Sequence, residues 1–151
     1  MITIEEFKNK ITKKSRLIGL DLGSKRIGIA ICDEYQSIAT PFKTLQKDNF
    51  NKFLDELKLI IKENNIKGII VGNPINMDGS LGPSAQSVKD VCVNILNNIN
   101  MPLCLWDERL STVGAFNLSS QLDIKVTKKV KNIDQNAAAF ILQGAIDRLK
   151  N

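Results

Sequence analysis

The sequence predicts an α/β fold: a mixed five-stranded sheet, with three antiparallel strands followed by two parallel ones, and helices on both faces. The N-terminal part holds short runs rich in Ile and Leu between turn residues, which is typical of hairpin-connected strands. After residue 48, helically spaced apolar residues alternate with short continuous apolar runs, which is typical of parallel βαβ units. Because no linker, repeat or low-complexity tract interrupts this order, we expect a single domain over residues 1–151.

Three antiparallel strands are expected first. Gly23-Ser24-Lys25 separates the first two and has the composition of a three-residue hairpin loop. Pro41 lies within the third and indicates an edge position or a bulge, because proline cannot donate a ladder hydrogen bond. A short helix over residues 3–12, capped by Thr3, precedes them. The strands are predicted at 16–22, 26–33 and 37–45.

Helix and strand alternate in the next part of the chain. Asp48 can cap a helix that reaches Ile61, and Pro83 suits the first turn of a second helix. The apolar runs at 68–72 and 102–106 are typical of buried parallel strands. These elements extend the antiparallel half into a mixed sheet.

Two more helices are predicted near the C-terminus. Ser111 or Thr112 can cap one that ends near Leu122. Asp134 precedes a strongly amphipathic helix, whose small residues at 137–139 would let it lie close to the sheet. The complete order of elements is that of the ribonuclease H-like fold.

Composition narrows the class of function. The 151 residues carry a formal net charge of +5 and a pI of about 9.2, a modestly basic balance that favours an acidic partner such as nucleic acid. The chain has no histidine, which excludes imidazole as a metal ligand or a base. The 3 cysteines lie in apolar runs and predict buried thiols in a reducing compartment. With no signal-peptide pattern and no run of about 20 apolar residues, we expect a cytoplasmic protein.

Three acidic positions lie at the ends of predicted strands and helices, where such a sheet would bring them together. Asp21 interrupts an apolar strand, and a buried carboxylate must be paired, protonated or bound to a cation. Glu108 follows a parallel strand, at the edge where α/β sheets collect catalytic groups, and Asp134 opens the last helix. Oxygen ligands suit hard cations, so these acids predict a site for Mg²⁺ or Mn²⁺. Two such ions about 4 Å apart could stabilise the attacking and leaving oxygens of a phosphodiester.

Each acidic position also has an alternative interpretation. Asp21 can cap the amides of the turn that follows it, and Asp134 can cap its helix. Asp107 can pair with Arg109 in a solvated turn. The pattern around Asp21 is also similar to the first phosphate loop of the actin, Hsp70 and sugar-kinase class, although 151 residues supply only one half of such a protein.

Basic and polar residues near the acids are expected to contact a phosphate backbone. Arg109 could hold a phosphate through two parallel hydrogen bonds. Asn76 lies in the turn-rich loop 72–83, whose amides and following helix N-terminus suit a phosphate. A basic segment before the last helix suits the same partner, with a solvated charge run as the alternative. Its lysines are Lys125, Lys128, Lys129 and Lys131.

Four motifs follow one another along the chain: LDLG at 20–23, VGNPINMDG at 71–79, WDERLST at 106–112 and IDQNAAA at 133–139. On these motifs the chain resembles the YqgF/RuvX family, bacterial ribonuclease H-like proteins regarded as pre-16S rRNA nucleases and related to Holliday-junction resolvases. The resemblance extends from Arg16 to Leu149. It implies that the family's catalytic and metal-binding acids fall on Asp21, Glu108 and Asp134, beside Arg109.

Three hypotheses about function follow. The first is a cytoplasmic, metal-dependent endonuclease that processes the 5′ end of precursor 16S rRNA in ribosome biogenesis, together with assembly partners. The second is a Holliday-junction-type DNA resolvase that uses the same acids. The third is a non-catalytic nucleic-acid-binding assembly factor, which would bind in a salt-sensitive way without turnover.

Overall fold

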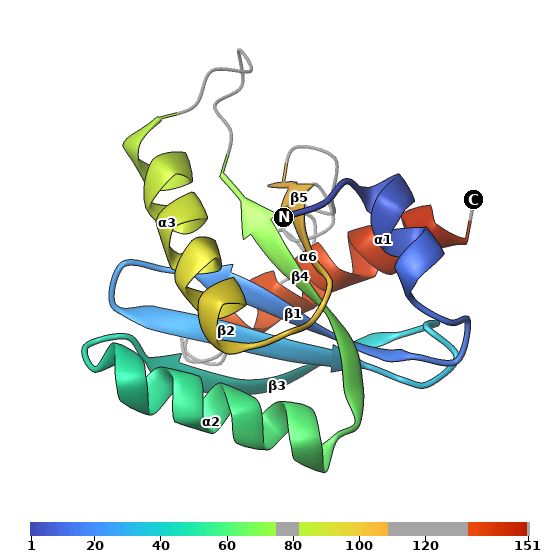
Figure 1. Ribbon diagram of the computed structural model, residues 1–151, viewed down its shortest axis with the longest axis horizontal. Helices are drawn as coiled ribbons and strands as arrows, with labels where there is room; N and C mark the ends of the chain where they lie inside the picture. The colour runs from blue at the N-terminus through green and yellow to red at the C-terminus, as the bar shows by residue number, and fades with distance from the viewer. Residues whose placement is uncertain (75–81, 109–132, 151) are drawn as a thin grey trace, which may run out of the picture.

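The computed structural model describes residues 1–74, 82–108 and 133–150. Its centre is one five-stranded sheet of antiparallel and parallel strands, with helices on both faces (Figure 1). The elements in chain order are α1 (Ile4–Lys10), β1 (Arg16–Leu22), β2 (Arg26–Cys32), β3 (Ala39–Gln46), α2 (Phe50–Glu63), β4 (Ile66–Asn73), α3 (Pro83–Asn98), β5 (Leu103–Asp107) and α6 (Ile133–Leu149). The strand order is β3-β2-β1-β4-β5. The predicted fold class is confirmed.

The antiparallel half forms as the apolar pattern predicts. β1 pairs with β2, and β2 pairs with β3, which lies at the edge of the sheet. Ile29 pairs with Lys43 and Ala30 with Pro41, so the register shifts by one residue within β3. A bulge on an edge strand accommodates a residue that cannot donate a ladder hydrogen bond. Both features expected of Pro41 are therefore present.

The parallel half places the carboxyl ends of three strands at one edge of the sheet. β4 pairs in parallel with β1, and β5 pairs in parallel with β4. The carboxyl ends of β1, β4 and β5 therefore point the same way, and the arrowheads of β4 and β5 lie side by side in Figure 1. On its outer side, β5 is bridged by Ile2, whose N–H donates to the Leu103 carbonyl at 3.1 Å.

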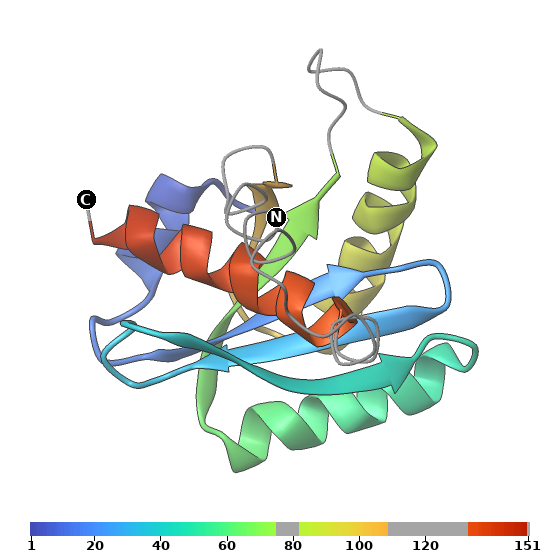
Figure 2. The same ribbon diagram turned by 180° about the vertical axis from the view of Figure 1, so that it is seen from behind.

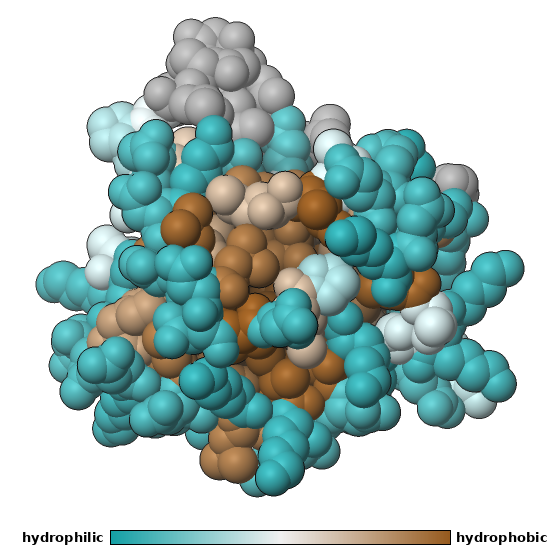
Figure 3. Space-filling model, in the orientation of Figure 1, coloured by the Kyte–Doolittle hydropathy of each residue, from teal (hydrophilic) through white to brown (hydrophobic). Residues whose placement is uncertain are grey.

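α2 and α3 cover one face of the sheet and enclose the larger hydrophobic core. The helical spacing of their apolar residues turns Leu57 and Ile95 toward Ile18 and Leu20 of β1. Half-buried apolar side chains border this core, and Figure 3 shows hydrophobic surface in the middle of this face with hydrophilic side chains around it.

The start of α2 differs by one residue from the prediction. Asn49 caps the helix, because its side chain accepts the N–H of Lys52 at 3.1 Å. Asp48 lies one residue too early for its carboxylate to reach that amide. At the start of α3, Pro83 occupies the first turn as predicted.

α6 crosses the other face of the sheet diagonally, with α1 beside it (Figure 2). A Cβ built on Gly19 of β1 would lie 2.7 Å from the Cβ of Leu142 and 3.1 Å from the carbonyl oxygen of Ala138. Real side chains do not pack that closely, so the absence of a side chain at Gly19 lets the helix approach. The small residue Ala138 is fully buried at this contact, as its place in the alanine run predicts.

One prediction about α6 is wrong and another is confirmed. The helix begins at Ile133, so Asp134 lies inside its first turn and does not precede it. The predicted buried face is confirmed, because Ala138, Ile141, Leu142, Ala145, Ile146 and Leu149 recur at helical spacing and are all buried. Within residues 136–150, the exposed side chains are confined to Asp147, Arg148 and Lys150.

Three further predictions have separate outcomes. The cysteines Cys32, Cys92 and Cys104 are free and buried, and burial raises the pKa of the Cys92 thiol to about 12, so these thiols act as small apolar groups. In the described ranges, no helix has the length and apolar character to cross a membrane. The helix predicted from Ser111 or Thr112 to Leu122 lies outside the described residues.

Replacing Gly19 should weaken the packing of α6. We expect Gly19→Ala to lower the free energy of unfolding by about 1–3 kcal/mol, the usual cost of forcing extra volume into a packed interior. Urea denaturation measures this change. Val93→Ala, on the exposed side of α3, is the control and should change stability little. Equal stability of Gly19→Ala and the wild type would contradict the close approach.

Candidate active site

Asp21 lies near the carboxyl end of β1, on the face that α6 covers. Strand alternation sends Ile18 and Leu20 into the core beneath α2 and α3, and it places Gly19 and Asp21 on the opposite face. Asp21 is half-buried and pairs across the ladder with Gly28 of β2. An acidic side chain is therefore held between packed apolar elements, as its place in the sequence predicts.

Glu108 follows the last residue of β5. Its side chain reaches toward β1 over β4, the strand that lies between them. Leu20 of β1 pairs with Val71 of β4, and Gly72 pairs with Trp106 of β5, so Gly72 lies level with Asp21. The Oε1 atom of Glu108 is 2.5 Å from the position that a Cβ on Gly72 would take. The two carboxylates thus approach each other above the missing side chain of Gly72.

The electrostatics agree with this placement. Burial, followed by the negative charges of Asp21 and then Asp107, raises the pKa of the Glu108 carboxyl to about 7 from an ordinary 4.5. Two carboxylates in one half-buried place cannot both ionise without cost unless a cation or a proton lies with them. Carboxylate oxygens are the ligands of hard cations, and the chain has no histidine to favour a softer ion. The donor set therefore fits Mg²⁺ or Mn²⁺.

The third predicted acid is placed by its backbone alone. Gln143 of α6 donates to the carbonyl of Ser37 and accepts from the N–H of Ala39, near the amino end of β1. Ala138 lies farther along, at Gly19. The next turn of α6 toward its N-terminus, which holds Asp134, continues toward the end of β1 that bears Asp21.

The structure tests the predicted site only in part. It brings Asp21 and Glu108 together, whereas the side chain of Asp134 lies outside the described residues. Among the side chains that are described, no three of the types His, Cys, Asp and Glu gather closely enough to hold a metal ion. The predicted phosphate contacts also lie outside the described ranges, namely Asn76, Arg109, Lys125, Lys128, Lys129 and Lys131. The roles of all these residues stay predictions.

The structure reveals a positively charged side chain, Lys47, that the sequence analysis did not single out. Lys47 lines a pocket of about 250 Å³ next to Leu22, where the β1–β2 turn, the end of β4 and the first turn of α3 meet. Its ammonium group donates to the carbonyl of Gly23 at 3.2 Å. The pocket also holds the hydroxyl residues Ser24, Ser84 and Ser87, and none of its described lining residues is acidic. No sequence signal marks Lys47, because four separate segments of the chain form this pocket.

Comparison with known proteins gives the family. A sequence model described as RuvX, Holliday junction resolvase, matches residues 15–148. The chain belongs to the RuvX family. A relative from Pelagibacter ubique is 74% identical over 151 residues, which is 100% of both chains, and one from Ruegeria pomeroyi is 42% identical over 149 residues, covering 99% of this chain and 97% of its own. Both carry the name "Putative pre-16S rRNA nuclease". The resemblance drawn from the four motifs is confirmed.

The fold of this RuvX-family chain is shared with a more distant protein. RuvC of T. thermophilus, solved in complex with Holliday junction substrate, superposes with a TM-score of 0.55 over 91% of this chain and 96% of its own. The two sequences are 8% identical, so the likeness concerns the fold alone. It supports the ribonuclease H-like architecture predicted from the order of elements.

The charge at Glu108 should make the metal-free protein less stable as the pH rises. Because the pKa is raised to about 7 in the folded state, the folded protein holds a proton that the unfolded chain releases near pH 4.5. Stability from this group is therefore full below pH 4.5 and falls as the pH rises through 7. One pKa unit corresponds to about 1.4 kcal/mol, and solvent screening at this half-buried site reduces the total effect to about 1 kcal/mol.

Urea denaturation of Glu108→Gln in EDTA tests this dependence. The variant should match the wild type near pH 4.5 and exceed its unfolding free energy by about 1 kcal/mol at pH 8. Glu63→Gln, at an exposed glutamate of α2, serves as the control and should follow the wild type at both pH values. A constant difference across the pH range would contradict the raised pKa of Glu108 in the folded protein.

Proposed function

We propose that this chain is a metal-dependent endonuclease of a single domain that hydrolyses phosphodiester bonds in precursor 16S rRNA. The observation that carries this proposal is the approach of Asp21 and Glu108 at the carboxyl edge of the sheet. It is supported by a relative that is 74% identical over the whole chain and carries the name "Putative pre-16S rRNA nuclease". Action on precursor rRNA would place the protein in the cytoplasm and in ribosome biogenesis.

Asp21, Glu108 and Asp134 would hold Mg²⁺ or Mn²⁺, two ions in the full site. When bound, such ions lower the pKa of a bound water and stabilise the charge on the leaving oxygen. The protein's own contribution is to fix its carboxylates on rigid elements, two at strand ends and one on a packed helix. The absence of histidine is then no obstacle, because activation of water by a metal needs no imidazole base.

The nucleic-acid strand would be positioned by groups around the acids. Arg109 and Asn76 would contact phosphates beside the cleavage point, and Lys125, Lys128, Lys129 and Lys131 would attract the backbone. Lys47 supports this assignment from the described part of the chain, because its pocket includes Leu22, the last residue of β1, at the same edge of the sheet as the acids. Phosphate contacts of this kind fix the position of the strand and add salt dependence to binding.

A DNA resolvase is the second candidate. The description of the family model names a Holliday junction resolvase, and the acids required are the same. Cleavage assays on precursor 16S rRNA and on four-way DNA junctions, run side by side, distinguish the two. Binding of RNA without cleavage under any metal would favour the third candidate, a non-catalytic assembly factor.

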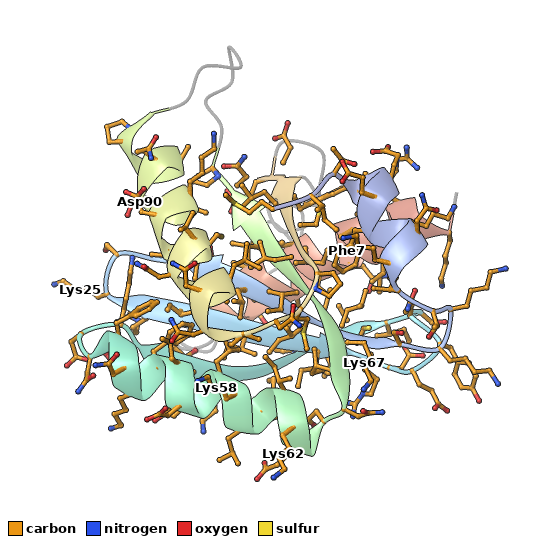
Figure 4. The ribbon with its side chains drawn as sticks, in the orientation of Figure 1. Phe7, Lys25, Lys58, Lys62, Lys67 and Asp90 are labelled. Carbon is orange, nitrogen blue, oxygen red and sulfur yellow. The ribbon has the colours of Figure 1, made fainter. Side chains whose placement is uncertain are left out.

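Loss of one carboxylate should abolish cleavage without unfolding the protein. We expect Asp21→Asn to slow single-turnover cleavage of a precursor 16S 5′-leader RNA by at least about 10²- to 10³-fold, the usual effect of removing one group that stabilises developing charge. EDTA should have the same effect on the wild type. Asp90→Asn makes the same chemical change on the exposed surface of α3 and should keep full activity (Figure 4). Cleavage by Asp21→Asn at the wild-type rate would contradict the assignment.

Lys47 should contribute to binding through charge alone. For Lys47→Gln we expect weaker RNA binding and a slope of log K against log salt concentration that is shallower by about 0.7–0.9. Fluorescence anisotropy over a salt series measures both. Lys58→Gln is the matched control, because Lys58 is exposed on α2, apart from the carboxyl edge of the sheet (Figure 4). Equal slopes for the two variants would remove Lys47 from the interface.

A further inference from the structure

Gly72 lies at a place where a side chain would displace Glu108 from its position near Asp21. It belongs to β4, the strand between Asp21 on β1 and Glu108 after β5. A Cβ on Gly72 would lie 2.5 Å from Oε1 of Glu108 and 2.5 Å from Cδ1 of Ile141. Real Cβ atoms essentially never come within 3.0 Å of another heavy atom, so any side chain at this position would displace one or both of these groups.

The need for glycine here comes from space and not from the backbone. The φ angle of Gly72 does not lie in the left-handed region that glycine alone adopts readily, and Gly72 has regular ladder partners in β5. Glycine inside a strand weakens that strand, and it typically marks a close approach of another group. At Gly72 the approaching groups are a core side chain of α6 and an acid of the candidate site.

We propose that Gly72 is a positioning residue for the acid pair. Its missing side chain lets the carboxylate of Glu108 lie over β4 and reach the neighbourhood of Asp21, which sits on the adjacent strand at the same level. Neighbouring strands are about 4.8 Å apart, so this arrangement brings the two carboxylates within reach of a shared cation. The consequence for metal binding rests on the proposed function, whereas the placement of Glu108 does not.

The two close contacts of Gly72 can be separated by mutation. Ile141→Val removes Cδ1, the atom of α6 that a Cβ at position 72 would meet at 2.5 Å, and it leaves Glu108 unchanged. Gly72→Ala in this background therefore creates its severe clash with Glu108 alone. Gly68→Ala is the matched control, because Gly68 lies on the same strand and the atoms nearest to its Cβ would belong to the core side chains of Phe7 and Leu17 (Figure 4 labels Phe7).

The experiment compares Ile141→Val, Gly72→Ala/Ile141→Val and Gly68→Ala. The first measurement is the ¹³C chemical shift of the Glu108 side-chain carboxyl in the metal-free protein, assigned with Glu108→Gln. The second is the Mn²⁺ dissociation constant from electron paramagnetic resonance. We expect Gly72→Ala/Ile141→Val to move the carboxyl resonance and to weaken Mn²⁺ binding by about 10- to 100-fold, as for other losses of ligand orientation. Gly68→Ala should be less stable than the wild type, but its Glu108 carboxyl resonance and its Mn²⁺ dissociation constant should stay unchanged.

A shorter acid should restore the site. Adding Glu108→Asp to Gly72→Ala/Ile141→Val withdraws the carboxylate by one methylene, and we expect part of the Mn²⁺ affinity to return. If Gly72→Ala/Ile141→Val keeps the carboxyl resonance of Ile141→Val, the proposal is overturned. If the wild type itself binds no Mn²⁺ and cleaves no RNA, the proposed function fails, and the carboxyl resonance still decides the role of Gly72.

If Gly72→Ala/Ile141→Val folds poorly, a comparison of unfolding free energies tests the proposal instead. Gly72→Ala is then compared with Gly72→Ala/Glu108→Ala by urea denaturation, each against its own glycine parent. Relief of the clash predicts a smaller loss of stability in the Glu108→Ala background. An equal loss in both backgrounds would show that Glu108 does not occupy the space above Gly72.

Discussion

The close packing of α6 on the sheet is the constraint on which the rest of this structure depends. It requires a row of positions without bulk: Gly19 on β1 and Gly72 on β4 face the helix, and Ala138 faces the strands. Helices normally lie about 10 Å from a sheet with side chains interleaved between them, and small residues shorten that distance. Because α6 is held this close, its first turn, with Asp134, is directed to the same edge as Asp21 and Glu108. The glycines that let α6 pack closely therefore also help to position the acids.

The acid pair opposes the stability that this packing provides. Burial, and after it the charge of Asp21, raises the pKa of Glu108, so the folded protein resists a second negative charge at this place. A protein that needed only stability would place an apolar side chain there, because well-packed apolar groups are often as stable as buried charges or more so. Retaining two mutually repelling carboxylates in a rigid, half-buried place is what a cation site requires. A bound cation would relieve this repulsion.

The strands were more predictable than the contacts between them. β1 has the bounds predicted for it, because its apolar residues end at turn residues on both sides. Asp48 and Asn49 have the same capping chemistry, and only the path of the chain selects Asn49. The buried face of α6 was predictable because its apolar residues recur at helical spacing, whereas the residue at which the helix begins was not. The contact of Glu108 with Gly72 depends on the register between β4 and β5, which no local pattern encodes.

The geometry of the site also explains how one family can contain proteins named for RNA processing and a model described as a DNA resolvase. Acids that hold a metal act on the phosphodiester, which is common to both polymers. Lys47 and the hydroxyl residues of its pocket suit phosphate oxygens, and phosphate contacts carry no information about base or sugar. Discrimination of RNA requires contacts to the 2′-hydroxyl or to the shape of the folded strand. If Asp21 and Glu108 act on the phosphodiester, substrate choice would be set by contacts outside this acid pair.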